Sequence, residues 1–271
     1  MIFRQIVFYA LLVGALSGLV LTVAQTWHVV PIIHSAEVFE AENASVPAIE
    51  HAGQLAVAND HYAHAHSADE WAPQNGFERT AFTLLSNILT AIGFALLVMV
   101  AMLSSNSRSR NKQAYFDWRH GLIWGAAGYT IFWLAPAMGL PPEIPLAATA
   151  DLEARQIWWL FAAVATAAGL AGLAFGKSPW RWAAPLLLAV PHLVGAPHIA
   201  GAMFADQPPA AAEQLELLAQ QFIGATAVAN AAFWLALGLA SAWAARRIII
   251  STVTKSPSGK ESPSELKIPS V

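Results

Sequence analysis

Long apolar runs, each about the length of a bilayer crossing, alternate with polar segments along this chain. A helix needs about 20 apolar residues to cross the hydrocarbon core. The runs are rich in Ala, Leu and Gly and lack the alternation of a barrel strand, and helices satisfy their own backbone groups within lipid. The pattern predicts an all-α membrane protein, a polytopic bundle of six transmembrane helices, at residues 5–30, 79–104, 118–139, 156–176, 182–204 and 218–245.

The polar segments complete a simple domain plan. The longest of them, residues 35–78, is predicted to be a loop on the outer side, and residues 1–250 are predicted to form a single transmembrane domain. The tail 251–271 is rich in Ser, Pro and Lys and is predicted to be disordered and cytoplasmic. Arg4 followed by an apolar run also resembles a signal peptide, but the run from Ile6 to Ala24 is too long for one, so we expect a retained helix.

Composition agrees with a lipid environment. Charged residues make up 11% of the chain, against roughly 25% in a soluble domain. The 11 Trp residues are typical of helices anchored at the headgroup level. The net charge of −3 gives no indication of nucleic-acid binding. Because there is no Cys, any metal site must use His, carboxylate, amide or backbone ligands.

The distribution of charge predicts the orientation. With a cytoplasmic N-terminus and alternating helices, 12 of the 14 Lys and Arg lie inside, and only Arg79 and Arg155 lie outside. This follows the positive-inside rule and places both termini in the cytoplasm. Fourteen of the 17 Asp and Glu then lie outside, where they should attract cations.

The outer loop carries the most specific candidate chemistry. Asp60, His61, His64 and His66 lie within seven residues and offer nitrogen and oxygen ligands for one divalent metal ion. Imidazole suits cobalt, nickel, copper and zinc alike, so the ligands do not select the metal. The alternative is a solvated polar loop in which the His residues are incidental, since a His-rich tract is only a compositional signal.

Further candidate ligands lie in or beside the apolar runs, where ionisable groups are costly. They are His28 near the outer end of the first run, His34 and Glu37 beyond it, and His192 and His198 in the fifth. The segment Pro191–His198 should bend or break its helix and free carbonyl groups. We hypothesise a path from the outer loop through His34 and His28 to His198 and His192. The alternatives are inter-helix hydrogen bonds and a kink that only packs.

Other polar and small residues are predicted to be structural. His120 lies at the start of the third run and fits an interfacial group. Asn87 and Asn230 fit inter-helix hydrogen bonds, and Gly121, Gly125 and Gly128 fit a close helix contact.

Two stretches of the chain are especially distinctive. They are Gly139–Pro145, which reads GLPPEIP, and Asp151–Trp159, which reads DLEARQIWW. Further characteristic stretches are Gln25–Ile32, Ala36–Glu40, Trp71–Pro73, Gly121–Gly125 and Pro191–His198. Together they resemble CbtA, a family of cobalt transporter subunits, and the resemblance covers about 245 residues, all but the tail.

The resemblance implies a multi-pass protein of the bacterial inner (plasma) membrane that supplies cobalt for cobalamin synthesis. It also implies a small His-rich single-span partner similar to CbtB. The resemblance implies five membrane-spanning helices, whereas the charge distribution in this chain favours six.

Two function classes remain. The first is a permease or permease subunit for divalent transition-metal ions, with cobalt favoured as the transported ligand and no permanently bound cofactor. The second is a non-conducting metal-binding, sensor or scaffold subunit, which needs the outer loop but not the His residues within the spans. An enzyme is disfavoured because the chain contains no HExxH or GxSxG pattern. It also contains no Walker A pattern of the form GxxxxGK followed by Ser or Thr, so we do not expect this chain itself to hydrolyse ATP in that way. The bilayer is a partner in either case, and a homo-oligomer stays open.

Overall fold

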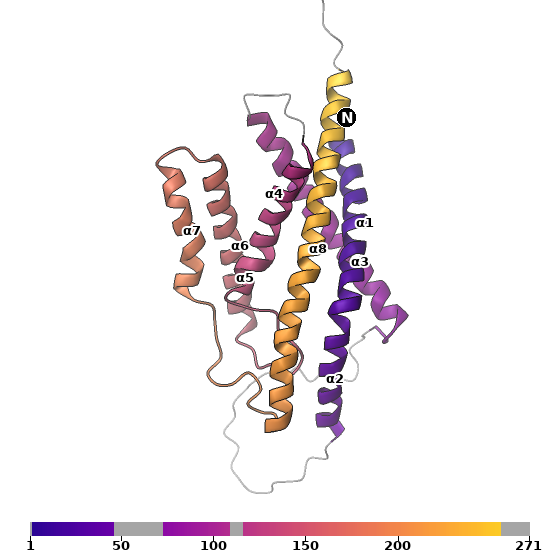
Figure 1. The fold of residues 1–271 in the computed structure, drawn as a ribbon, viewed down its shortest axis with the longest axis vertical. Coiled ribbons are helices and arrows are strands. Elements are labelled where there is room, and N and C mark those ends of the chain that lie inside the picture. The colour runs from indigo at the N-terminus through magenta and orange to yellow at the C-terminus, as the bar shows by residue number, and fades with distance from the viewer. Residues whose placement is uncertain (1, 46–72, 109–115, 256–271) are drawn as a thin grey trace, which may run out of the picture.

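The computed structural model describes residues 2–45, 73–108 and 116–255. All regular elements in these residues are helices (Figure 1). In order they are α1 (Ile2–His28), α2 (Val30–Ser45), α3 (Phe77–Arg108), α4 (Trp118–Tyr129), the π-helix η1 (Thr130–Leu134), α5 (Ala135–Ala137), α6 (Leu152–Phe175), α7 (Trp180–Val194) and α8 (Pro209–Lys255). The predicted all-α class is confirmed.

Four of these helices are long and apolar enough to cross a membrane, so the protein is polytopic. They are Ile2–His28, Phe77–Ser105, Leu152–Phe175 and Pro209–Ser251. Two of the six predicted helices differ from the expectation. The run at 118–139 is divided into α4, η1 and α5, and the run at 182–204 is helical only as far as Val194. The 15 residues of α7 span about 22 Å, less than the ~30 Å of a hydrocarbon core.

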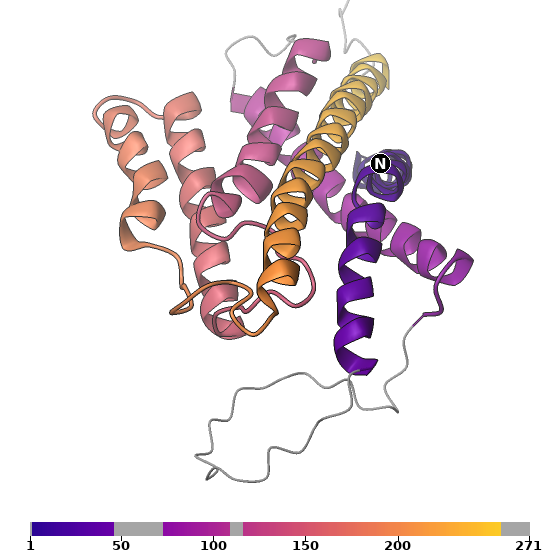
Figure 2. The same ribbon diagram turned by 60° about the horizontal axis from the view of Figure 1, so that its bottom comes forward.

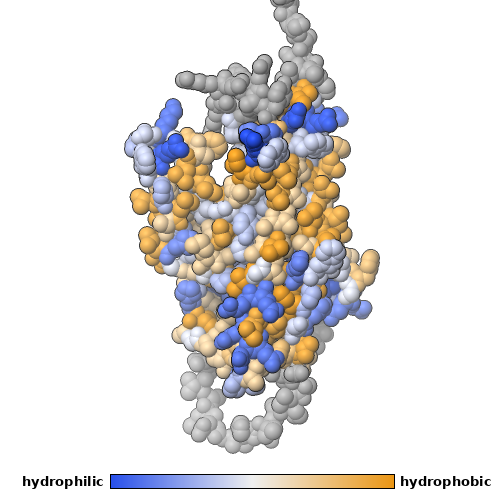
Figure 3. Space-filling model, in the orientation of Figure 1, coloured by the Kyte–Doolittle hydropathy of each residue, from blue (hydrophilic) through white to orange (hydrophobic). Residues whose placement is uncertain are grey.

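The long helices run roughly parallel or antiparallel to one another, and the charged residues lie mostly at the two ends of the bundle. The start of α1, the end of α8 and the α6–α7 turn lie together at the top of Figure 1. We call this the basic end; it holds Arg4, Lys177, Arg181, Arg246 and Arg247. The opposite end, which we call the acidic end, holds α2 and the α5–α6 and α7–α8 connections, with Glu37, Glu40, Glu143, Asp151, Glu153 and Asp206. An apolar band separates the two polar ends (Figure 3).

Small residues bring α4 and α8 into close contact. A Cβ atom on Gly125 would lie 2.5 Å from the carbonyl oxygen of Trp234, and one on Gly238 would lie 2.3 Å from the carbonyl oxygen of Gly121. A Cβ on Gly128 would collide with the Trp234 ring, at 2.1 Å. These distances confirm the predicted role of the α4 glycines in close helix approach. Gly14 and Gly18 of α1 make the same kind of contact with α3.

Two asparagines inside the bundle show the two ways in which a polar side chain is satisfied there, between helices and within one helix. Asn87 on α3 donates to Thr22 Oγ1 at 3.0 Å and to Gln25 Oε1 at 2.7 Å, both on α1. The inter-helix prediction is therefore confirmed for Asn87. It is wrong for Asn230, whose amide donates to the Thr226 carbonyl one turn earlier in α8.

His120 lies outside the bundle interior, at the first turn of α4. Its backbone N–H donates to Asp117 Oδ1, and its Nδ1 lies 2.6 Å from the same oxygen. The two side chains form a capping box, which satisfies N–H groups that a helix start leaves open. The backbone N–H of His120 is the main reason that the pKa of Asp117 is lowered. The predicted structural role of His120 is confirmed.

A second apolar cluster lies at the acidic end and corrects the predicted loop 35–78. Residues 30–45 are helical, because Ala36 on α2 is buried among Ile144, Phe204, Leu215 and Ala219. This cluster ties α2, the α5–α6 connection, the α7–α8 connection and the start of α8 together. Burying one face stabilises a helix that the polar sequence alone does not favour.

The last helix extends beyond the predicted run 218–245 at both ends. It begins at Pro209 and ends at Lys255. Ser251 of α8 and Gln5 of α1 are joined by side-chain hydrogen bonds, which support the helix where it continues past the predicted apolar run. The prediction of disorder from 251 is wrong for residues 251–255, and residues 256–271 lie outside the described part of the chain.

Candidate functional site

Glu37 is the centre of a charged contact between α2 and α3. Its Oε2 lies 2.9 Å from His34 Nδ1, and its Oε1 accepts a hydrogen bond of 2.8 Å from Arg79 Nη2. The Arg79 hydrogen bond, with a smaller contribution from His34, lowers the pKa of Glu37 against the opposing effect of burial. Two predicted metal ligands, His34 and Glu37, therefore lie together, and Arg79 occupies one carboxylate oxygen.

His28 is the last residue of α1, and its side chain is exposed. Gln25, one turn earlier on α1, accepts a hydrogen bond from Asn87. The structure thus places His28 at the surface near the acidic end, two residues before the start of α2, the helix that carries His34.

The segment from Pro191 breaks its helix, as predicted. Gly195 ends α7 with a φ of +85°, a conformation that residues with a side chain rarely adopt. His192 is half-buried, with its ring 6.1 Å from the ring of Trp158 on α6. His198 lies beyond the break and is exposed.

The predicted ligands are not gathered into one site in the described residues. No group of three His, Asp or Glu able to hold a metal ion occurs there. The helices that carry His34 and His192, α2 and α7, lie on opposite sides of α8 in both views (Figures 1 and 2). Asp60, His61, His64 and His66 lie outside the described residues, so their metal site stays a prediction.

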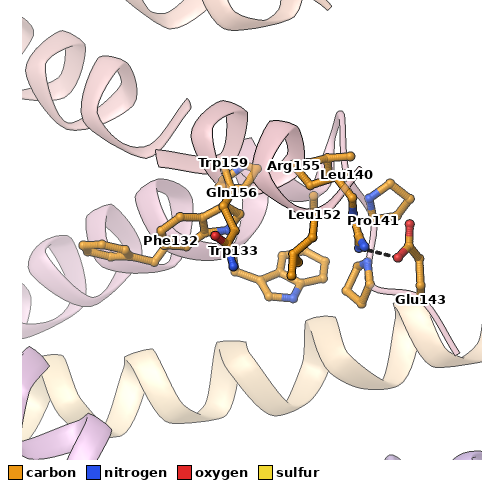
Figure 4. A pocket seen from close by; sticks show the side chains of 12 residues that line it. Phe132, Trp133, Leu140, Pro141, Glu143, Leu152, Arg155, Gln156 and Trp159 are labelled. Carbon is orange, nitrogen blue, oxygen red and sulfur yellow. Dashed lines mark hydrogen bonds and ion pairs between the residues drawn. The ribbon is translucent and has the colours of Figure 1, made fainter. Parts of the chain in front are cut away.

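A pocket of about 390 Å³ lies at the acidic end of η1, α5 and α6. Three segments of the chain supply the side chains that line the pocket, as Figure 4 shows. They contribute Phe132, Trp133, Pro136 and Ala137, then Leu140, Pro141, Pro142 and Glu143, and lastly Leu152, Arg155, Gln156 and Trp159. The two most distinctive motifs of the sequence, Gly139–Pro145 and Asp151–Trp159, therefore meet in this pocket.

Local sequence explains the shape of the wall. Pro136 has no N–H to donate to the carbonyl of Phe132, and the N–H of Ala135 instead reaches the carbonyl of Thr130 in π-helical fashion. The widened turn carries Phe132 and Trp133 into the wall. Across the pocket, Asp151 caps α6 by accepting from the N–H of Ala154 at 2.9 Å, which fixes the turn that carries Arg155.

Glu143 and Arg155 form an ion pair at this pocket (Figure 4). Their side chains are 18% and 26% exposed, so the pair is largely removed from water. Burial raises the pKa of Glu143, and the positive charge of Arg155 opposes this effect only in part. Sequence reasoning quoted both motifs but assigned neither residue to a site. The available signal was that the predicted topology places Arg155 on the outer side, where a basic residue departs from the positive-inside rule and calls for a partner.

Comparison with known families agrees with the helical, membrane-spanning architecture. A family model described as "Probable cobalt transporter subunit (CbtA)" matches residues 3–246. The chain belongs to the CbtA family. The match takes in all the described helices apart from the first residue of α1 and the last residues of α8, so this CbtA protein is a membrane cobalt transporter subunit. No curated protein and no solved structure matched the chain.

Proposed function

We propose that this CbtA protein is the ion-conducting subunit of a cobalt uptake system and that cobalt approaches from the acidic end. The separation of charge along the bundle carries the proposal. Acidic side chains at one end raise the local concentration of a divalent cation. An inside-negative potential then favours inward movement of a cation.

The proposed orientation places the basic end in the cytoplasm of a bacterium, at the inner membrane. It gives six crossings, formed by α1, α3, α4 with η1 and α5, α6, α7 and α8. Both termini are then cytoplasmic. The two outer exceptions support this orientation, because Arg79 pairs with Glu37 and Arg155 pairs with Glu143. Each basic side chain is neutralised, so neither opposes the positive-inside rule.

The proposed capture site is the segment between α2 and α3, with Asp60, His61, His64 and His66 as first ligands. His28 ends α1, and His34 and Glu37 lie in the first half of α2, before this segment. His192 and His198 are proposed to act later, at the broken end of α7. The wide separation of α2 and α7 favours two separate ligand groups over one continuous line.

The family description as a subunit supports a protein partner. We propose a small His-rich single-span protein similar to CbtB, whose His side chains would supplement the ligands of this chain. Cobalt delivered in this way would serve cobalamin synthesis.

A second candidate function is a non-conducting subunit that collects cobalt for another protein. One observation favours it. Polar groups inside the bundle, Asn87, Gln25 and Thr22, are used in hydrogen bonds between α1 and α3 rather than left open to an ion.

The deciding experiment is uptake of radioactive cobalt into proteoliposomes with an inside-negative potential, with this chain alone and with its CbtB-like partner. Uptake that requires His192 and His198 supports conduction through this chain. A His120→Ala variant serves as the control, because His120 caps α4 at the opposite end. Cobalt binding without uptake in both preparations contradicts the conducting role and supports the second candidate.

A further inference from the structure

The pocket at the acidic end has no part in the proposed transport of cobalt. One carboxylate paired with an arginine is a poor site for a divalent cation, which takes several oxygen or nitrogen ligands. The pocket instead offers a positive group on α6 in direct contact with a negative group on the α5–α6 connection, and aromatic and proline side chains line the pocket around this pair. Its volume of about 390 Å³ lies within the range of small-molecule sites.

Both charged groups retain capacity for a further partner. A guanidinium has five N–H donors, and Glu143 accepts from one nitrogen of Arg155, Nη2. Nε of Arg155 is buried and has no hydrogen-bond partner in the described chain. On the other side, the raised pKa of Glu143 means that Arg155 does not fully offset the cost of burying its ionised carboxylate. An added cation near Glu143 and an added acceptor near Arg155 would both be favourable.

The position of the pocket points to the bilayer as the source of its ligand. It lies at the first two turns of α6, and Leu152 and Leu160 of that helix are 59% and 58% exposed. In a membrane-spanning helix, such side chains face hydrocarbon. Trp133 and Trp159 in the pocket wall are the residue type that gathers at the headgroup level. The charged pair therefore lies where lipid headgroups lie.

We propose that this pocket binds the headgroup of a zwitterionic aminophospholipid, such as phosphatidylethanolamine, from the outer leaflet. The phosphate binds Arg155 and the amide of Gln156, and the ammonium group binds Glu143 and the faces of the neighbouring aromatic rings. Matching a zwitterion to the ion pair satisfies both charges at once, which an anionic lipid without an amine does not do. The lipid would hold the α6–α7 hairpin against η1 and α5.

The test uses the full-length protein in nanodiscs containing equal amounts of phosphatidylethanolamine and phosphatidylglycerol. After transfer to detergent, native mass spectrometry counts the lipids that each chain retains. We expect one phosphatidylethanolamine per chain in the wild type. Arg155→Gln and Glu143→Gln should each lower its retention about tenfold, as expected for loss of a charge-assisted hydrogen bond. Arg79→Gln is the matched control, because it breaks the Arg79–Glu37 ion pair, which lies at the acidic end but outside the pocket, and it should retain the lipid.

Three results would overturn the proposal. The first is equal retention of the two lipids by the wild type, a measurement that does not depend on how well a variant folds. The second is unchanged retention in correctly folded Arg155→Gln protein. The third is binding of phosphoethanolamine or inorganic phosphate to lipid-free protein as tightly as the lipid binds, which would identify a soluble ligand in place of the membrane.

Discussion

Glu37 joins two helices through a single carboxylate, with His34 on its own helix and Arg79 on α3. Its side chain is 30% exposed, so solvent weakens the pair without removing it. A contact of this kind is worth about 0.2–1 kcal/mol. Its larger consequence is geometric, because it holds the middle of α2 against the first turn of α3.

The lowered pKa of Glu37 makes this contact dependent on pH. A carboxyl whose pKa is lower in the folded state adds stability above its unfolded pKa of 4.5, and that stability is lost as the pH falls through the folded value. We expect Glu37→Gln to lower the unfolding temperature at pH 7 and to lower it less at pH 3. Thermal unfolding in detergent across this pH range measures the difference.

Glu40→Gln provides the control for this prediction, since Glu40 is an exposed acid on the same helix. It should change the unfolding temperature little at any pH. A Glu37→Gln effect that is equal at pH 7 and pH 3 would contradict the assignment of the lowered pKa to the Arg79 and His34 contacts.

The helix elements associate through backbone contact as much as through side chains. On α4, three glycines at intervals of three and four residues face α8, and Gly238 of α8 faces them in return. Lipid tails are as apolar as the helix faces, so the hydrophobic effect does not drive two helices together within the bilayer. Close van der Waals packing of small residues drives their association instead. The α4–α8 contact should therefore tolerate added volume poorly.

Gly125→Ala tests this contact. The new Cβ would lie 2.5 Å from the Trp234 carbonyl oxygen, a backbone atom that moves only with its helix. We expect a loss of about 1–3 kcal/mol, the usual cost of overpacking, measured as a lower unfolding temperature in detergent.

Gly93→Ala is the matched control on α3, because a Cβ there meets no atom within 4 Å. Alanine is also the better helix former, so this variant should be neutral or slightly more stable. Equal destabilisation by the two substitutions would show that the α4–α8 approach is not limited by the glycine.

At the scale of the whole molecule, α7 is the shortest of the helical runs on which the number of crossings depends. Its 15 helical residues are too few for a full hydrocarbon core, and the irregular residues that follow the Gly195 break must complete the passage if it crosses. Irregular backbone at that depth is tolerated where protein or water satisfies its polar groups. The predicted six crossings therefore depend on α7 and on the divided run of α4, η1 and α5, in addition to the four long helices.

Single cysteines on either side of α7 measure its crossing directly, because the natural chain has none. Ser178→Cys lies in the α6–α7 turn and Ala205→Cys lies in the α7–α8 connection, and both positions are exposed. With a membrane-impermeant maleimide, we expect Ala205→Cys to react in intact cells and Ser178→Cys to react only after permeabilisation. Labelling of both from the same side would mean that α7 does not cross.

The sequence by itself determined where the long apolar helices form and which ends carry which charge. Both are local properties: an apolar stretch of sufficient length partitions into lipid, and basic and acidic residues flank it. It also indicated the break near Pro191 and the α4 glycines, because proline and glycine act on the backbone where they occur.

Only the tertiary structure decided which distant residues meet. Glu37 and Arg79 are 42 positions apart, and nothing in their neighbours' hydropathy selects this pair. The Glu143–Arg155 pocket depends on a π-helical turn and on the rotation of α6, and α2 became helical through burial of Ala36 in a cluster from four segments. Hydropathy specifies how deep a residue lies in the membrane, whereas helix rotation and packing specify its neighbours.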